Sequence, residues 1–308
     1  MKTKYPIKPE FFPFNKFTAP HSKRIVLLAQ KFMKTPKFIF RDKELNVSVH
    51  KIDGYKDEKV EFYIISPKKI SDPSPAIIFI HGGGFVYEGF TSHFKIAVDY
   101  AKECHAKVIY IKYNLAPKYP FPFPQYECAK VLHYVYENVD KLGIDSNKIA
   151  FTGDSAGAFL CVSSQILVRK MGVVFKPVCQ VLIYPWLDGR SDSESNKKYT
   201  DTPMWNSTLS KKSRNFTNPN NESFPPELTS VVEYNDLSFM PPTYIEVAEF
   251  DCLHDDGILF NRILEKENIN VVLYEVKGTM HGYETKYKAP TTQELIKKRI
   301  EYFKRMFK

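Results

Sequence analysis

The sequence is poor in glycine and cysteine and has no long apolar run. Only 13 of the 308 residues are glycine, so a cluster of glycines needs a local reason. The five cysteines are scattered and form no Cys-x-x-Cys pair, which argues against a disulfide framework or a structural zinc site. No apolar stretch approaches the roughly 20 residues of a membrane span, and the N-terminal residues lack the apolar region of a secretion signal. We therefore expect a cytoplasmic protein with no stable membrane association.

Positive charge is in excess, with a net charge of +9. The densest cluster, Lys297-Lys298-Arg299 with Lys304 and Arg305, falls on an expected C-terminal helix, where a solvated helix face is the simpler interpretation. We see no basic groove with interleaved aromatic side chains, so we expect no nucleic-acid partner. The length predicts one large domain with insertions or two domains.

One stretch has the pattern of a strand, a sharp turn and a helix. Apolar residues from Ile149 lead into Gly153-Asp-Ser155-Ala-Gly157, and a second apolar run follows. Gly-x-Ser-x-Gly at such a turn is a nucleophile elbow, because the glycines let the backbone lift the serine hydroxyl above the sheet. The alternative is a glycine-bounded turn with an incidental serine. We predict Ser155 as a nucleophile.

A second glycine cluster follows another apolar run. The segment Ala76-Ile-Ile-Phe-Ile80 reads as a strand buried on both faces and ends in His81-Gly-Gly-Gly-Phe85. Three glycines in a glycine-poor chain predict free N–H groups directed at an oxyanion. His81 is expected to hold this loop by hydrogen bonds. The predicted oxyanion donors are Gly83, Gly84 and Ala156, and the predicted substrate-binding residues are His81, Phe85 and Trp205.

The apolar patterns alternate between strands and helices along most of the chain. This alternation predicts an α/β fold with a mostly parallel sheet covered by helices on both faces. Two antiparallel strands are expected at 45–52 and 60–66, before the parallel part of the sheet. The expected parallel strands include 76–80, 108–113, 178–184, 242–248 and 271–276, and the expected helices are 95–102, 125–139, 258–267 and 292–307.

Two segments interrupt this pattern. Residues 1–44 carry one amphipathic stretch, with Ile25, Leu28, Ala29 and Phe32 at helical spacing. We expect this N-terminal segment to fold over another part of the protein. Residues 188–235 are polar and irregular. We predict that both form a cap over the active site of a catalytic domain at 45–308. Nothing strongly apolar and amphipathic marks a lipid-facing lid.

A serine nucleophile needs a histidine base and an acid that orients it. Only His254 and His281 follow Ser155, and His281 lies on a glycine-flanked loop after a strand, whereas His254 begins a helix. Asp251 is the first residue after a strand, at the sheet edge where sites gather, whereas Asp255 and Asp256 fit the first turn of a helix. We predict the triad Ser155, His281 and Asp251.

Together these residues resemble the hormone-sensitive-lipase-like family of α/β-hydrolase carboxylesterases. The resemblance covers about residues 45–305. It implies the same triad and oxyanion donors, a cap, and a preference for small esters, with no metal and no other cofactor. Three positions depart from the family pattern: Cys252, Ala158 and Tyr283. The motifs that carry the resemblance are His81-Gly-Gly-Gly-Phe85, Tyr113-Asn-Leu-Ala-Pro117, Gly153-Asp-Ser-Ala-Gly157, Tyr184-Pro-Trp-Leu-Asp188, Asp251-x-Leu-x-Asp255 and His281-Gly-Tyr283.

Two alternatives to a small-ester carboxylesterase remain open at this stage. A non-catalytic member of the fold could use the pocket as a small-molecule receptor. An amidase, an acyltransferase or a lactone-opening enzyme could use the same triad. The chain could be a monomer or a homodimer, since the strand at 271–276 could be an exposed edge able to pair with a second copy.

Overall fold

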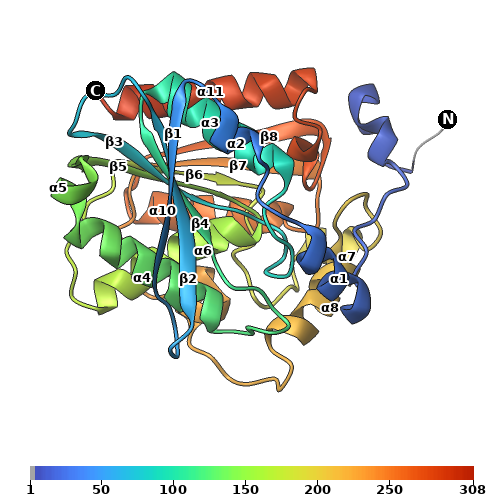
Figure 1. The fold of residues 1–308 in the computed structure, drawn as a ribbon. Helices are drawn as coiled ribbons and strands as arrows, with labels where there is room; N and C mark the ends of the chain where they lie inside the picture. The colour runs from blue at the N-terminus through green and yellow to red at the C-terminus, as the bar shows by residue number, and fades with distance from the viewer. Residues whose placement is uncertain (1–3) are drawn as a thin grey trace.

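The computed structural model describes residues 4–308, so residues 1–3 of the predicted cap lie outside the described part. The chain forms one eight-stranded sheet in the order β1-β2-β4-β3-β5-β6-β7-β8 (Figure 1). Within residues 4–308, no helix has the length and apolar character that a membrane crossing requires. The strands are β1 (Leu45–Asp53), β2 (Lys59–Pro67), β3 (Ser74–Ile80), β4 (Lys107–Lys112), β5 (Ile144–Asp154), β6 (Cys179–Ile183), β7 (Thr243–Phe250) and β8 (Val271–Met280).

The sheet is mostly parallel, as predicted. β1 pairs antiparallel with β2 and β2 antiparallel with β4, and every pairing from β4 onward to β8 is parallel. The apolar strands are buried because helices cover both faces. In β3, for example, Ala76 to Ile80 are at most 4% exposed. β8 ends the strand order, so the predicted edge strand is confirmed.

Helices cover the two faces of the sheet in separate layers. Figure 1 shows α3 and α11 on one face and α4, α6 and α10 on the other. Each helix follows a strand and packs back on the sheet, which brings the carboxyl ends of the parallel strands to one edge. The sheet-covering helices are α3 (Thr91–Cys104), α4 (Phe123–Glu137), α6 (Ala156–Lys170), α10 (His254–Lys266) and α11 (Pro290–Met306).

The polar insert is more ordered than the sequence predicted. Asn206 caps α8 by accepting a hydrogen bond from the N–H of Leu209, and Ser193 caps α7 in the same way through Asn196. Side chains that cap helices therefore account for the polarity that we interpreted as irregular structure. The insert contains α7 (Glu194–Lys198), α8 (Ser207–Thr217), α9 (Pro226–Thr229) and the 3₁₀ turn η2 (Val231–Glu233).

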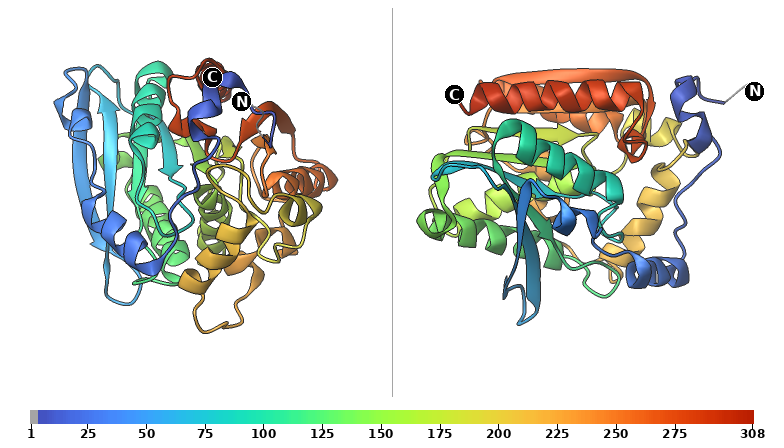
Figure 2. Two further views of the ribbon diagram at one scale, coloured as in Figure 1. Left: turned by 90° about the vertical axis from the view of Figure 1, so that its right-hand side faces the viewer. Right: turned by 45° about the horizontal axis from the view of Figure 1, so that its top comes forward.

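The N-terminal segment lies against the insert at one end of the molecule (Figure 2). Thr18 forms a parallel bridge with Met204, and Ala19 donates its N–H to the carbonyl of Met204. The described elements before the sheet are η1 (Pro9–Phe14), α1 (Lys23–Phe32) and the short helix α2 (Phe38–Arg41). Two segments nearly 200 residues apart in sequence thus lie side by side.

The amphipathic stretch forms helix α1, and of its regularly spaced apolar residues only Ala29 packs against the rest of the protein. Ile25, Leu28 and Phe32 are exposed, whereas Val26 is fully buried against Val86. The segment therefore does fold over another element, but through Val26 rather than through Ile25, Leu28 and Phe32. The buried face of α1 is narrow, so most of its apolar side chains lie outside it.

Candidate active site

Ser155 sits on the sharp turn between β5 and α6. Its backbone has φ +51° and ψ −119°, a strained conformation that is held by the packing around it. A side chain at Gly157 would overlap the carbonyl oxygen of Ile80 in β3, and one at Gly153 would lie 2.6 Å from the backbone of Gly157. The two glycines are therefore required because α6 and β3 approach the turn so closely.

The structure brings Ser155, His281 and Asp251 together from three separate elements. Asp251 follows β7 and His281 directly follows β8, which is longer than predicted. The Nε2 of His281 lies 2.9 Å from the Oγ of Ser155, and its Nδ1 lies 2.7 Å from Oδ2 of Asp251. If Nδ1 donates its proton to the carboxylate of Asp251, Nε2 is free to accept a hydrogen bond from the hydroxyl of Ser155.

The Asp251 carboxylate is held by hydrogen bonds and shielded from solvent. It is 0% exposed, and its Oδ1 accepts the N–H of Leu253 at 2.9 Å. The ring of Tyr184 lies 4.7 Å from that of His281, centre to centre, and limits how the imidazole can turn. A carboxylate, an imidazole and a hydroxyl thus form one hydrogen-bonded series, from Asp251 through His281 to Ser155.

The glycine loop after β3 presents unsatisfied donors beside the serine. Within the described chain, the N–H groups of Gly83 and Gly84 have no hydrogen-bond acceptor. Gly84 has φ +60°, a conformation that favours glycine. Ala156 is the first residue of α6, where a helix leaves its N–H groups free. These three N–H groups are available for an anion.

Asp154 anchors this loop from the elbow itself. Its Oδ1 accepts the N–H of Gly82 at 2.8 Å, and its Oδ2 lies 3.2 Å from Nε2 of His93. Burial acts to raise the pKa of Asp154, but His93 and the N–H of Gly82 together hold it below its usual value. The residue before Ser155 therefore fixes the position of the glycine loop.

His81 holds the loop but does not contact the cavity. It is 0% exposed, its Nδ1 lies 2.7 Å from the carbonyl oxygen of Gly82, and its ring stacks on Tyr113 at 4.5 Å. Burial lowers the pKa of His81 to about 4, so it is neutral at neutral pH. The loop-holding prediction agrees with this position, whereas substrate contact by His81 does not.

A small cavity of about 70 Å³ lies at Ser155. Trp205 lines it, and the edge of the indole lies so close to Gly84 that an added Cβ there would be 2.5 Å from the ring. Phe85 instead lines an adjacent aromatic cavity of about 290 Å³ that reaches toward α8. Of the predicted substrate-binding residues, Trp205 therefore faces the serine, and Phe85 belongs to the neighbouring space.

The rival acid and base candidates point elsewhere. His254 contacts Asp255 at 3.0 Å and Glu275 at 3.3 Å, away from Ser155. Asp256 accepts the backbone N–H groups of Leu187 and Asp188, each at 3.0 Å, and burial raises its pKa well above the usual value. Asp256 thus holds the start of the insert onto α10, and His254 joins α10 to β8. Among residues 4–308, no group of three or more His, Cys, Asp or Glu could hold a metal ion.

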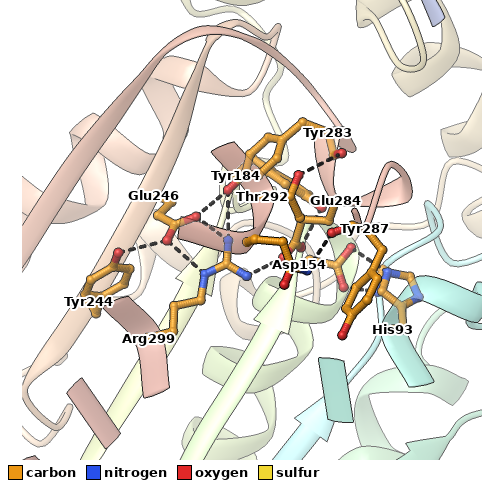
Figure 3. A network of polar contacts seen from close by, with 12 residues as sticks. His93, Asp154, Tyr184, Tyr244, Glu246, Tyr283, Glu284, Tyr287, Thr292 and Arg299 are labelled. Atoms are coloured by element: carbon orange, nitrogen blue, oxygen red, sulfur yellow. Dashed lines mark hydrogen bonds and ion pairs between the residues drawn. The ribbon is translucent and has the colours of Figure 1, made fainter. Parts of the chain in front are cut away.

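A buried polar network next to the site was missed by sequence reasoning (Figure 3). Arg299, predicted to lie on a solvated helix face, is 0% exposed and forms ion pairs with Glu246 and Glu284. Glu284 lines the serine cavity and accepts the hydroxyl of Tyr184 at 2.9 Å. The one available signal was Glu246, a carboxylate within an otherwise apolar buried strand, which requires a buried partner.

With this geometry established, comparison with known proteins gives the family. The profile of the α/β hydrolase fold family matches residues 77–285. The chain belongs to this family, and the predicted resemblance to its hormone-sensitive-lipase-like class is confirmed.

Relatives and solved structures agree with this assignment. A protein of Acanthamoeba polyphaga mimivirus named as an α/β hydrolase is 30% identical over 234 residues, covering 74% of this chain and 66% of that relative. The carboxylesterase NlhH of Mycobacterium tuberculosis is 29% identical over 273 residues, covering 87% of this chain and 84% of that relative. A bacterial heroin esterase superimposes with a TM-score of 0.85 at 25% identity, covering 98% of both chains. The chain thus spans just under two thirds of the mimivirus protein and most of the other two.

Proposed function

We propose that this protein is a serine carboxylesterase that hydrolyses small, short-acyl esters through an acyl-enzyme. The observation that carries the proposal is the continuous hydrogen-bonded series from Asp251 through His281 to Ser155, at 2.7 Å and 2.9 Å. Such a series turns a weakly nucleophilic hydroxyl into an attacking group. The coarser prediction, a carboxylic ester hydrolase, is confirmed by the relatives.

The roles follow from the positions of the atoms. Ser155 Oγ attacks the ester carbonyl while its proton passes to Nε2 of His281. Asp251 stabilises the imidazolium that forms. The carbonyl oxygen gains negative charge next to the N–H groups of Gly83, Gly84 and Ala156. His281 then gives its proton to the leaving alkoxide as the ester C–O bond breaks.

The second half of the reaction uses the same groups. Water takes the place of the alcohol, loses a proton to His281 and attacks the acyl carbon. The bond between Ser155 Oγ and the acyl carbon breaks, and the serine recovers its proton. The low exposure of Ser155, 3%, and of His281, 5%, supports strong electrostatic stabilisation, because little bulk water screens the oxyanion.

The size of the substrate follows from the space beside the serine. A cavity of about 70 Å³ beside Ser155 supports a short rather than a long acyl group. We propose that residues 1–44 and 188–235 act as the cap, because Ala19 from the first segment and Met204 and Trp205 from the second line this cavity. The cap thus limits the acyl group.

The proposal is tested by hydrolysis of 4-nitrophenyl esters from acetyl to dodecanoyl. We expect turnover that falls steeply beyond short acyl chains in the wild type and is absent in Ser155→Ala. Equal turnover of acetyl and dodecanoyl esters would contradict the proposed size limit. Absence of turnover with every ester in the wild type would contradict the esterase and favour a receptor of the same fold.

A further inference from the structure

Helix α1 presents an apolar stripe to the solvent. Ile25, Leu28 and Phe32 lie on one face and are 46%, 56% and 69% exposed. A different side of the helix is the packed one, with Val26 fully buried and with Ala29 and Met33 packed beside it. The stripe is therefore not needed to hold the helix in place, and three large apolar side chains on one helix face are an unusual exposure for a monomer.

Basic residues accompany this stripe in the sequence. From residue 16 to residue 43 the chain has eight Lys and Arg and a single acidic residue, Asp42, so this segment carries a net charge of +7. All eight basic residues are exposed, and none forms an ion pair with a described residue. The eight are Lys16, Lys23, Arg24, Lys31, Lys34, Lys37, Arg41 and Lys43.

The segment is attached to the catalytic loop. The Nε2 of Gln30 donates to the carbonyl oxygens of Val86 and Ala116, both at 2.7 Å, and Val86 lies two residues after Gly84. Ala19, just before α1, lines the serine cavity. Figures 1 and 2 show α1 beside the insert that holds α8, on the cap side of the molecule.

We propose that residues 16–43 form a docking surface for an anionic lipid interface. The apolar stripe of α1 enters the boundary between head groups and acyl chains, and the basic residues contact anionic head groups. Exposed apolar side chains flanked by Lys and Arg are the features by which a helix lies in a membrane surface. Docking in this orientation brings the cap side of the cavity toward the lipid.

Other occupants fit the surface less well. A second copy of the chain would bring a charge of +7 against the same charge, and the described residues of this segment offer only Asp42 to offset it. A nucleic acid would match the charge but would leave Ile25 and Leu28 in water. An anionic lipid surface satisfies both the charge and the apolar stripe.

This inference revises one expectation from the sequence. From the sequence we expected no strongly apolar, amphipathic lid that faces lipid. Since the face of α1 that carries Ile25 is exposed, the helix is such an element. The association is peripheral and reversible, because a single short helix inserts only its outer face and its charge contribution is screened by salt.

Vesicle co-sedimentation tests the proposal. The full chain is mixed with vesicles of phosphatidylcholine alone or with one third phosphatidylserine, at low and at high ionic strength. We expect partition onto the anionic vesicles to be at least tenfold stronger, and to fall with salt. Each basic residue removed is expected to weaken it about fivefold, so that Lys23→Gln/Lys31→Gln falls by about 25-fold.

Matched variants distinguish vesicle binding by the apolar stripe from non-specific binding by exposed apolar residues elsewhere. Ile25→Ser/Leu28→Ser/Phe32→Ser is expected to lose at least tenfold in partition, whereas Met171→Ser/Val174→Ser, exposed apolar residues at the far end of α6, should bind as the wild type does. Lys297→Gln/Lys304→Gln on α11 is the charge control. All four variants should hydrolyse a soluble acetyl ester at the wild-type rate. Failure of the vesicle-binding proposal can therefore be told apart from failure of the proposed esterase activity.

Three results would overturn the proposal. The first is equal partition of the wild type onto neutral and anionic vesicles. The second is a stripe variant that binds as well as the wild type. The third is a concentration-dependent dimer that the stripe variant loses, together with no vesicle binding, which would make the stripe an interface between copies of the chain.

Discussion

At the scale of single residues, the two histidines after Ser155 have opposite surroundings. His281 lies between Ser155 and Asp251, whereas His254 lies between Asp255 and Glu275. We therefore expect His281→Gln to lower kcat for an acetyl ester by about 10³-fold or more, since the base is lost. His254→Gln should stay within about twofold of the wild type. Steady-state kinetics of both variants decide this, and equal losses would contradict the assignment of the base.

A third histidine, His21, links the packing of the N-terminal segment to the pH dependence of stability. His21 is 8% exposed, its ring lies 5.3 Å from that of Trp205, and neither of its ring nitrogens has a hydrogen-bond partner among the described residues. Burial lowers the pKa of His21 to about 4. In the unfolded chain this histidine gains a proton below about pH 6.5, while in the folded chain it stays neutral down to about pH 4.

Because the unfolded chain binds the extra proton, the free energy of unfolding falls as the pH drops from about 6.5 to about 4. His21→Phe keeps the ring contacts and removes this proton. We expect the variant to retain up to about 2 kcal/mol of the stability that the wild type loses between pH 7.5 and pH 4.5. Urea unfolding at both values measures it. The same loss in wild type and variant would show that His21 is not buried as described.

The three residues of the proposed triad were predictable because each lies at a feature that can be recognised in the sequence alone. Ser155 lies within a glycine-bounded turn, Asp251 follows a buried strand, and His281 follows a strand and precedes a glycine. Their mutual distances agree with that prediction, and their roles stay proposals. Arg299 could not be predicted in the same way, since its partners Glu246 and Glu284 come from other elements that packing brings together.

At the scale of elements, the elbow depends on close contact between α6 and β3. A side chain at Gly157 would meet the backbone carbonyl of Ile80, which cannot move without breaking the sheet. We expect Gly157→Ala to lower the free energy of unfolding by about 3 kcal/mol or more. Gly172→Ala is the matched control, because φ is +84° there but nothing lies within 4 Å of an added Cβ.

Gly172→Ala should lower the free energy of unfolding only by the strain of its backbone conformation, about 1 kcal/mol. Urea unfolding of the two variants compares them directly. A Gly157→Ala variant as stable as Gly172→Ala would mean that the helix can shift away from the sheet, and that the close approach is not required.

Most sheet elements were predictable because buried parallel strands are nearly continuous apolar runs. The predicted strands at 76–80 and 178–184 lie within a residue or two of β3 and β6. The elements of the proposed cap were not predictable, for two physical reasons. In α7 and α8 the polar residues cap and cover short helices, and in α1 an apolar periodicity marks a face that remains in solvent. Periodicity predicts a helix but not which side is covered.

At the scale of the whole molecule, the Arg299 network fastens the C-terminal helix α11 to the sheet and to the cavity wall. Arg299→Met would leave Glu246 and Glu284 buried without their cation. We expect it to lower the free energy of unfolding by about 3–5 kcal/mol. Lys298→Met, next in the chain and partly exposed beside Glu294, should change it by less than about 0.5 kcal/mol.

Urea unfolding distinguishes the two variants, and circular dichroism in water shows whether Arg299→Met folds at all. A variant of Arg299 as stable as the variant of Lys298 would contradict the account of the network as a fastening between α11 and the sheet. Because Glu284 also lines the serine cavity, partial unfolding at α11 would be accompanied by loss of turnover.

The central claim is that Ser155 forms a covalent intermediate. The most direct measurement is mass spectrometry of the chain after reaction with diethyl 4-nitrophenyl phosphate, which phosphorylates activated serines and releases 4-nitrophenolate. The account predicts one diethylphosphoryl group per chain, located on Ser155, with turnover lost in proportion to labelling and no label in Ser155→Ala. Ester hydrolysis by a fully labelled chain, or a label on another residue, would contradict it.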